Sequence, residues 1–542
     1  MTDLDHVYVD YSEFVDEFAR ERLAPPLARI WDGDYNLFSE IHGEFEHSFS
    51  FIRNDTGDAF IDLPLDHYVS EWVLDPNSRS TKDLHLTFDK DGARWSGKVT
   101  SARVTWASKG QRVLRLTAKH DYEHLKKIRI WANPFLPAEI QIPKSWTMIG
   151  PADWALATTL HLALLRKNAS LWMVPDDPLD IGQWINLDMR NWNMVIKPVS
   201  LLGSSAPPAM VMSRFKDFHT AAKDIAADAQ LSIECRRYLP GDPDPIPGMN
   251  LKHGCLVFEI VDKSGWNTET AFGGSLLTGL QRAFKSIGSD GLTEGIHYID
   301  HPDFPDEYSR PGWKGTLPQA PWIVFEDGPY TGVESTEYEY RPPGPVQFVT
   351  GGQSMPGINE VLKAAIIGLG GMAGTALLGQ TQLGGVIEAI AEPFYTDTIM
   401  AFQAHKEHGR IQELGDHHYF EEWVDGSDRA YTLSAQVAMR KAKWETRERH
   451  IATVEVNDAA PYTVGQNGYG DFFVSDRVAV HAAGMPKHVL FVEQVEKLEY
   501  EFSNSRRGWT IEVGQSEAND PLLALYGKWE ETASGLRELG VL

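Results

Sequence analysis

The chain has 542 residues, 42% of them hydrophobic and 23% charged, a composition typical of globular proteins that fold as several domains. Its 50 basic residues are outnumbered by 76 acidic ones, and the net charge of −26 argues against a protein that grips nucleic acid through phosphate contacts. Two cysteines, Cys235 and Cys255, are too few for a disulfide framework or a four-thiolate zinc site, so we expect free thiols, with a 235–255 bridge as the alternative.

The N-terminal residues predict a short helix. The start MTDLDHVYVDYSEF is acidic and has no apolar run, so we do not expect a signal peptide. Residues 10–23 place their apolar side chains on one helical face, and Pro25 and Pro26 end the helix. We expect this segment, residues 1–26, to pack on its own domain or on a neighbouring subunit.

Residues 27–145 predict a β-barrel-like domain. Six short runs largely alternate apolar and polar side chains, and Asp32-Gly33 and Asp91-Gly92 are good hairpin turns between runs. Short strands at this spacing are typical of a small barrel or sandwich. The runs are LARIWDGD, FEHSFSFIRND, AFIDLPL, DLHLTFDKDG, ARWSGKVTSARVTW and QRVLRLTAKH.

Residues 146–345 predict a mixed α/β region. The run TMIGPADWALATTLHLALLRK has a continuous apolar face and predicts a well-buried helix that ends near Lys167. Residues 213–230 predict an amphipathic helix with Ser213 as a candidate N-cap, and the strand-like runs LSIECRRY and GCLVFEIVD follow it. The proline-rich stretch that ends this region is expected to be ordered loop with one strand at 321–326.

Residues 346–415 contain a glycine-rich apolar insertion. The run at 364–387 carries no charged side chain and is just long enough to span a bilayer. One interpretation is a membrane-active or plug-like segment. The other, which we favour because glycine lowers helix propensity, is a tightly packed hairpin buried at a subunit interface. The expected apolar interaction residues are Leu369, Met372, Leu377, Leu378 and Val386.

Residues 416–542 predict a long helix at 428–450, a second β-domain and a C-terminal helix with Asp520 as its cap. Together with the earlier regions, this pattern predicts an α+β, multidomain fold in which β-barrel-like domains are joined by helical segments. The strand-like runs of the second β-domain are IATVEV, DRVAVHA, VLFVEQVEKLEYEF and GWTIEVG.

No motif in the chain predicts a catalytic residue or a cofactor. The run GQSMP at 352–356 resembles a nucleophile elbow, but proline stands in place of its last glycine and no clear strand leads into it. The glycine-rich run at 368–374 lacks the Lys-Ser/Thr pair of a phosphate loop. Both cysteines lie in strand-like runs, where cysteine acts as a small hydrophobe.

A histidine cluster is the one candidate for a metal centre. A spacing of three on a helix puts two side chains on one face, so a site is geometrically possible, but the H-E-x-x-H pattern is missing. We favour a solvated polar stretch, and the carboxylates at 421–428 add no weight because sequence cannot give their separations. The cluster contains His405, His408, Asp416, His417 and His418.

Eight strings in the chain resemble the minor tail proteins of actinobacteriophages, especially those that infect mycobacteria. The strings occur in order from about residue 23 to residue 475, so the resemblance covers most of the chain. They are LAPPLARIWDGDYNL, FIRNDTGDAFIDLPLDHYVSEWV, HLTFDKDGARWSGKV, KHDYEHLKKIRIWANPFLPAEIQIP, SLWMVPDDPLD, SGWNTETAFGGS, FVTGGQSMPGINE and DAAPYTVGQNGYGDFF.

The resemblance implies a virion component encoded beside the tape-measure gene and similar to siphophage tail-associated hub proteins. Those hubs share a fold with the baseplate hubs of contractile tails, and they are trimers. Their two barrel-like domains per subunit produce a pseudo-sixfold ring that matches the hexameric distal tail ring. Some relatives carry peptidoglycan-cleaving domains, but no motif for one is found here, and the family supplies no catalytic residues.

The sequence therefore predicts a structural subunit of the tail-tip hub, assembled in the host cytoplasm, and not an enzyme. We expect a homotrimer that contacts the distal tail ring, the tape measure protein and downstream tip or fibre proteins, with no cofactor. An acidic lumen would let DNA pass without specific binding. The alternatives are a tail-associated peptidoglycan hydrolase, based on residues 405–418, and a receptor-binding or membrane-inserting module with transient host-membrane contact, based on 364–387.

Overall fold

The structure, a computed structural model, describes residues 24–262, 323–352 and 402–514 with short gaps, and two further strands that pair antiparallel, β13 (Lys285–Ile287) and β14 (Glu294–Ile296). The gaps within these ranges fall at 78, 107–111, 170–171, 173, 203, 205, 207, 230, 326–332, 426–437, 440–441, 444, 458–461, 467–468, 482–490 and 504–505.

Several predicted segments fall wholly or mostly outside the described residues. They include the leading helix before residue 24, the glycine-rich run at 364–387, and the C-terminal helix from Asp520. The role predicted for the glycine-rich run therefore stays a prediction. Its five apolar residues are Leu369, Met372, Leu377, Leu378 and Val386.

The first strands form an antiparallel sheet in the order β4-β7-β6-β5-β1-β2. All six predicted alternating runs are strands, and Asp91 and Gly92 form the tight turn between two of them, as predicted. One strand and one short helix, β2 and α2, were not predicted. The elements are β1 (Leu27–Asp32), β2 (Leu37–Ile41), β3 (Glu46–Ile52), β4 (Asp58–Pro64), α2 (Tyr68–Leu74), β5 (Leu84–Lys90), β6 (Ala93–Trp106), β7 (Arg112–His120) and the 3-10 helix η1 (Asp121–Lys126).

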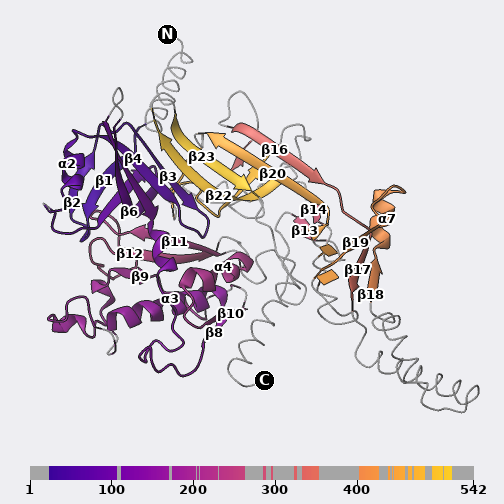
Figure 1. Ribbon diagram of the computed structural model, residues 1–542, viewed down its shortest axis with the longest axis horizontal. Coiled ribbons are helices and arrows are strands. Elements are labelled where there is room, and N and C mark those ends of the chain that lie inside the picture. The colour runs from indigo at the N-terminus through magenta and orange to yellow at the C-terminus, as the bar shows by residue number, and fades with distance from the viewer. Residues whose placement is uncertain are drawn as a thin grey trace, which may run out of the picture.

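The last strands of the chain continue this sheet. Strand β22 pairs antiparallel with β3, with Tyr500 opposite Phe49, and the sheet then runs through β23 and β20 to β16. Figure 1 shows these strands beside the first ones, although hundreds of residues separate them in the chain. The added strands are β15 (Val324–Phe325), β16 (Val333–Arg341), β20 (Arg449–Asn457), β21 (Arg477–Val480), β22 (Phe491–Phe502) and β23 (Arg507–Gly514).

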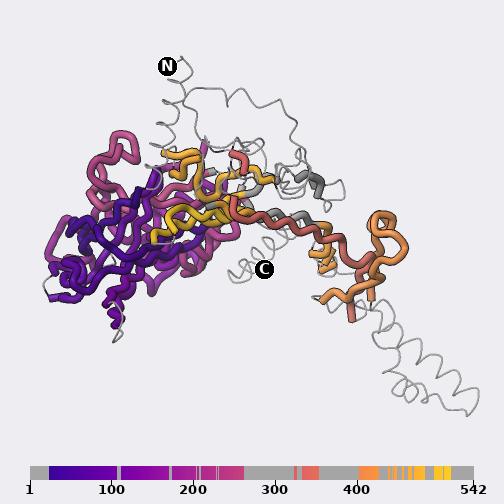
Figure 2. Tube along the Cα trace, turned by 90° about the horizontal axis from the view of Figure 1, so that it is seen from above, coloured from indigo at the N-terminus to yellow at the C-terminus, as the bar shows by residue number. Residues whose placement is uncertain are grey.

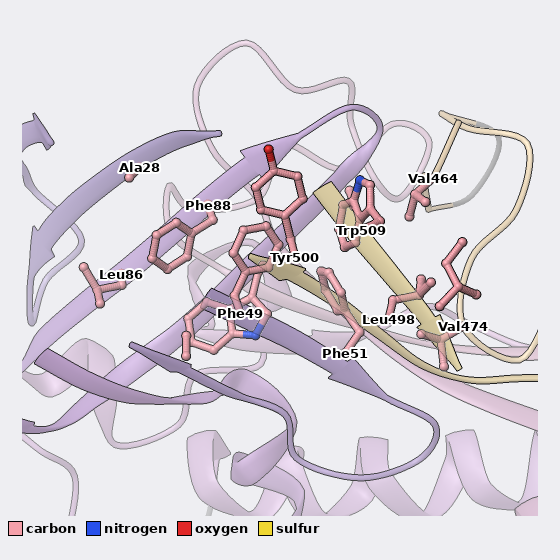
Figure 3. Packing of buried hydrophobic residues seen from close by; sticks show 14 of the residues in the cluster. Ala28, Phe49, Phe51, Leu86, Phe88, Val464, Val474, Leu498, Tyr500 and Trp509 are labelled. Carbon is pink, nitrogen blue, oxygen red and sulfur yellow. The ribbon is translucent and has the colours of Figure 1, made fainter. Parts of the chain in front are cut away.

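One hydrophobic core joins the two ends of the chain, and we call the sheet with this core the sheet body. Phe49 stacks on Phe88 and Tyr500 with ring centroids 5.0 and 5.4 Å apart, and Trp509 meets it edge-on at 5.6 Å (Figure 3). Aromatic packing of this kind is a large source of stabilisation. The fold is therefore mostly sheet with some helices, of the α+β class. The described strands form an open sheet that ends at β2 and β16, not a closed barrel.

A second unit, which we call the α/β body, has its own hydrophobic core. Its three-stranded sheet has the order β11-β12-β9, β8 and β10 form a separate two-stranded antiparallel sheet, and two helices, α3 and α4, pack against these strands (Figure 1). Its elements are β8 (Trp146–Pro151), α3 (Ala152–Ala169), η2 (Ile181–Gln183), η3 (Met189–Asn191), β9 (Met194–Ile196), β10 (Pro208–Ser213), α4 (Phe218–Asp228), β11 (Leu231–Arg237) and β12 (Leu256–Asp262).

Three helix boundaries differ from the prediction. The run before Ala152 is strand β8, because it pairs with β10 and only the residues after it turn helical. Ser213 ends β10 and is not the cap of α4; the cap is Asp217, whose Oδ1 accepts a hydrogen bond from Thr220 N at 2.8 Å. The predicted helix at 428–450 ends earlier, because Arg449 already begins β20.

A small sheet stands apart from both bodies at the far end of the β16–β20 ribbon (Figure 2). Its order is β18-β17-β19, and Phe348 and Val424 belong to its own small core. Of the predicted strand at 321–326, the structure describes residues 323–325, which contain β15. The small sheet contains β17 (Gln347–Gly351), β18 (Phe402–Lys406), α7 (His408–Leu414) and β19 (Glu421–Trp423).

Candidate protein-interaction site

A buried ion pair joins the sheet body to the α/β body. Asp121 follows β7 and Arg237 ends β11, and both side chains are almost fully buried. Arg237 Nε and Nη2 donate to the two Asp121 carboxylate oxygens at 2.8 and 3.0 Å, in a bidentate geometry. Ser96 Oγ donates to the same carboxylate at 2.6 Å, and Arg237 Nη1 donates to Gly254 O at 2.9 Å. The charges are thus paired and hydrogen-bonded, as burial requires.

The electrostatics of this junction fix the protonation states. Burial would raise the pKa of the Asp121 carboxyl, but the charge of Arg237 and hydrogen bonds from His124 and Arg237 hold the pKa well below its usual range. Burial also lowers the pKa of the nearby His85 and His120 to about 4. At neutral pH the ion pair is charged and both of these histidines are neutral.

Strand β11 makes hydrogen bonds to residues from an early and a late part of the chain. The side-chain amide of Asn54 donates to Leu231 O at 2.8 Å and accepts from Ile233 N at 2.8 Å, so it replaces a neighbouring strand. On the other side, Arg236 Nη1 donates to Gln466 Oε1 at 2.8 Å. Strand β11 is therefore a main connection between the two bodies.

The α/β body carries most of the strongly exposed apolar side chains among the described residues. They lie between residues 135 and 202, and we call this set the apolar surface. Leu179 is 92% exposed and Leu202 is 97% exposed, whereas a typical surface leucine is partly covered by its neighbours. The full set is Phe135, Ile140, Ile142, Ile149, Trp172, Val174, Leu179, Ile181, Trp184, Ile185, Leu187, Leu201 and Leu202.

A largely apolar cavity of about 380 Å³ opens in the same body. Helix α3 supplies Ala157 and His161, and Met189 and Val199 complete much of the wall. Leu187 and Leu202 of the apolar surface lie two and three residues along the chain from Met189 and Val199. Cavities of this size and character bind apolar groups. No local motif marks this site in the sequence, because its loops have neither helical nor strand periodicity.

The residues predicted as alternatives for chemistry do not gather into a centre. His405 Nε2 lies 2.7 Å from Glu407 Oε1, and His418 Nδ1 lies 2.7 Å from the backbone oxygen of Gly415. In the described part of the chain, no group of three or more His, Cys, Asp or Glu side chains could hold a metal ion. Residues 353–356, which include the Ser354 of the predicted elbow, lie outside the described residues.

Both cysteines are free and buried. Burial raises the pKa of the Cys235 thiol well above its ordinary value, and it raises the pKa of the Cys255 thiol to about 12. Neither thiol is therefore a thiolate at neutral pH, and the prediction of free thiols is confirmed. Among the described helices, none is long and apolar enough to cross a membrane.

Comparison with solved structures finds phage tail proteins. The tail protein from Neisseria meningitidis MC58 shares 11% identity and a TM-score of 0.36, with 92% of this chain and 99% of that chain covered. The 43 kDa tail protein of prophage MuSo2 from Shewanella oneidensis shares 7% identity and a TM-score of 0.38, with 90% and 98% covered. At these scores we draw no conclusion from the likeness.

Comparison with known sequences finds much more similar proteins. Minor tail protein Gp28 of Mycobacterium phage L5 is 37% identical, and its counterpart in Mycobacterium phage D29 is 38% identical, each over 96% of this chain and 96% of the relative. The family model described as Siphovirus ReqiPepy6 Gp37-like protein matches residues 27–515. The expected resemblance to mycobacteriophage minor tail proteins is confirmed. The chain belongs to the family of Siphovirus ReqiPepy6 Gp37-like proteins, which includes minor tail proteins of mycobacteriophages.

Proposed function

We propose that this chain is a structural subunit of the tail-tip hub of a long-tailed phage, where it joins the distal tail ring to the tip or fibre proteins. Its family membership supports a place in the virion tail. The observation that carries the proposal is the sheet body, in which strands from both ends of the chain share one sheet and one core. Such a block is rigid, and the apolar surface beside it offers a contact for a neighbour.

The subunits would assemble as a homotrimer around the tail axis. Among the described strands, the main path of the large sheet ends at β2 and β16, each with one strand neighbour, and a closed ring of copies is a common way to cover such edges. The tape measure protein would end at this ring until infection. The net charge of −26 supports passage of DNA without specific binding, because an acidic wall repels phosphates.

Removal of the gene tests the proposal. Phage that lack the chain should give particles without tails or with unsealed tails, and expression of the chain in trans should restore complete particles. Cryo-electron microscopy of intact virions should then show three copies at the tail tip. Complete, infectious tails without the chain, or a position along the tail tube, would contradict the proposal.

A further inference from the structure

We propose that the apolar surface of the α/β body is a docking site for an apolar segment of a different virion protein, and that this segment is flanked by lysine or arginine residues. The proposal rests on the proposed function only for the place of the chain in the virion tail. It assigns the surface to a second kind of protein, and not to the contact between copies of this chain.

The loop at 177–184, which carries Leu179 and Ile181 of the apolar surface, is held by its own hydrogen bonds. Asp177 Oδ1 accepts a hydrogen bond from Leu179 N at 3.0 Å, and Asp180 Oδ1 accepts one from Gly182 N at 2.9 Å. Trp184 Nε1 donates to the backbone oxygen of Pro178 at 3.1 Å, which closes the loop on itself. These bonds hold the leucine and isoleucine side chains outward in the free chain, so little conformational entropy would be lost on docking.

Two further hydrogen bonds tie loops of the apolar surface to other parts of the α/β body. Trp172 Nε1 donates to Phe135 O at 3.1 Å, and the backbone of Asn186 bonds Asn168 O at 3.0 Å at the end of α3. The loops that carry Phe135 and residues 172–187 thus meet near the C-terminal end of α3. A face with this many exposed large apolar groups is typical of a protein-binding surface.

The cavity beside α3 can bind one side chain of the partner segment. Its volume of about 380 Å³ exceeds the space that one water-sized group needs, and apolar residues such as Ile196 and Met249 line it. Interfaces commonly gain most of their binding energy where an aromatic or aliphatic side chain fills such a pocket. The partner segment is therefore expected to place one large apolar side chain there.

The acidic side chains of the apolar surface indicate which kind of partner can bind there. Between residues 174 and 190 the surface carries Asp176, Asp177, Asp180 and Asp188 against the single cation Arg190, which pairs with Asp188. A second copy brings the same carboxylates and a net charge of −26, and anionic lipid or nucleic acid would be repelled as well. A segment with basic flanks is attracted to the carboxylates while its apolar part covers the leucines.

Photo-crosslinking in intact virions tests this proposal. A photoreactive amino acid in place of Leu179 is expected to crosslink to a peptide of another virion protein, in which apolar residues lie between lysines or arginines. The same amino acid in place of Leu74, which is 44% exposed on α2 of the sheet body, is the control and should not give that peptide. A crosslink to a second copy of this chain, to a peptide without basic flanks, or to nothing would overturn the proposal.

A charge-neutral variant tests the electrostatic part. Asp177→Asn with Asp180→Asn keeps the oxygens that accept from Leu179 N and Gly182 N and removes two charges, although the bond from Gln183 Nε2 to Asp180 Oδ2 is lost. The crosslinking yield at position 179 should fall about two- to tenfold, as for two exposed ion pairs. An unchanged yield would overturn the assignment of a basic-flanked partner. Absence of the chain from purified virions would be a different result, because it would contradict the proposed function itself.

Discussion

The sheet body and the α/β body present different surfaces to water. Among described residues 24–120, which form most of the sheet body, Trp106 is the one large hydrophobic side chain more than half exposed, at 64%. In the α/β body, Leu179 and Leu202 reach 92% and 97%. The difference does not come from a poor core, because Leu156 and Leu160 of α3 are fully buried. The exposed side chains are therefore additional to the core.

The comparison teaches that one body is built for rigidity and the other for contact. The sheet body uses its large side chains inside, where strands from both ends of the chain meet. The α/β body keeps a second set outside on loops that hydrogen bonds hold in place. A buried ion pair connects the two bodies, and a small buried apolar cluster of Trp31, Tyr35 and Leu239 contains residues of both. We therefore expect changes at the junction and changes at the apolar surface to have very different effects.

Acidification should affect the junction most. His85 and His120 have pKa values lowered by burial to about 4, whereas the unfolded chain has the ordinary value of 6.5. As the pH falls below 6.5, the unfolded state takes up protons that the folded state refuses, so stability falls until about pH 4 and then levels for these groups. The loss should reach about 3 kcal/mol for each histidine. Chemical denaturation at a series of pH values measures it.

The double variant His85→Gln, His120→Gln tests whether these two histidines cause the effect. It should be less stable at pH 7 but lose much less stability between pH 6.5 and pH 4. His42→Gln changes a histidine whose side chain is 75% exposed and should keep the dependence of the unmodified chain. An equally steep decline in the double variant would show that other groups cause it.

Removal of the buried cation should be nearly as damaging. Arg237→Leu leaves the Asp121 carboxylate buried without its bidentate partner, which is expected to lower the free energy of unfolding by about 3–5 kcal/mol. Lys98→Met breaks the exposed pair with Asp83 and is the matched control, with a loss under about 1 kcal/mol. Equal losses in the two variants would mean that the junction adds no more than a surface pair. Urea denaturation of the purified chain gives both values.

Local patterns in the sequence predict the strands but not their partners. Strands such as β3 and β7 alternate polar and apolar residues in the sequence, so their existence follows from periodicity. Burial alternates along β7, whereas β3 is buried on both faces. Strand β2 buries one residue of five and α2 has only two turns, and neither leaves a clear pattern. The pairing of β22 with β3 joins residues more than 440 positions apart in the chain. The hydrogen bond from Ser48 Oγ to Glu499, for example, joins residues 451 positions apart.

The candidate site was hidden from sequence reasoning for the same reason. Asp121 and Arg237 are 116 positions apart, and each alone is an ordinary charged residue. The apolar surface follows no period of two or 3.6, so its leucines look like scattered hydrophobic residues, and only the structure shows that they are exposed. The family resemblance covered these loops without showing what they do.

Loss of the Asn54 bridge should have an intermediate effect. Asn54→Ala leaves Leu231 O and Ile233 N of β11 without their partner and should lower the free energy of unfolding by about 1–3 kcal/mol. Asn54→Asp keeps the acceptor for Ile233 N but places a carboxylate oxygen against Leu231 O, and because the two oxygens repel each other its loss should be at least as large. A loss in Asn54→Asp much smaller than in Asn54→Ala would show that the contact with Leu231 O contributes little. Thermal denaturation of both variants provides the test.

The smallest effect on stability is expected at the apolar surface. Leu202→Ala removes a side chain that is 97% exposed and should change the free energy of unfolding by less than about 0.5 kcal/mol. The same substitution at the fully buried Leu156, in the same body, should cost about 2–5 kcal/mol because it leaves a cavity. A large loss at Leu202 would mean that its loop belongs to the core. A small loss means that the folded chain does not need this leucine, so its exposure is available for a contact with a partner.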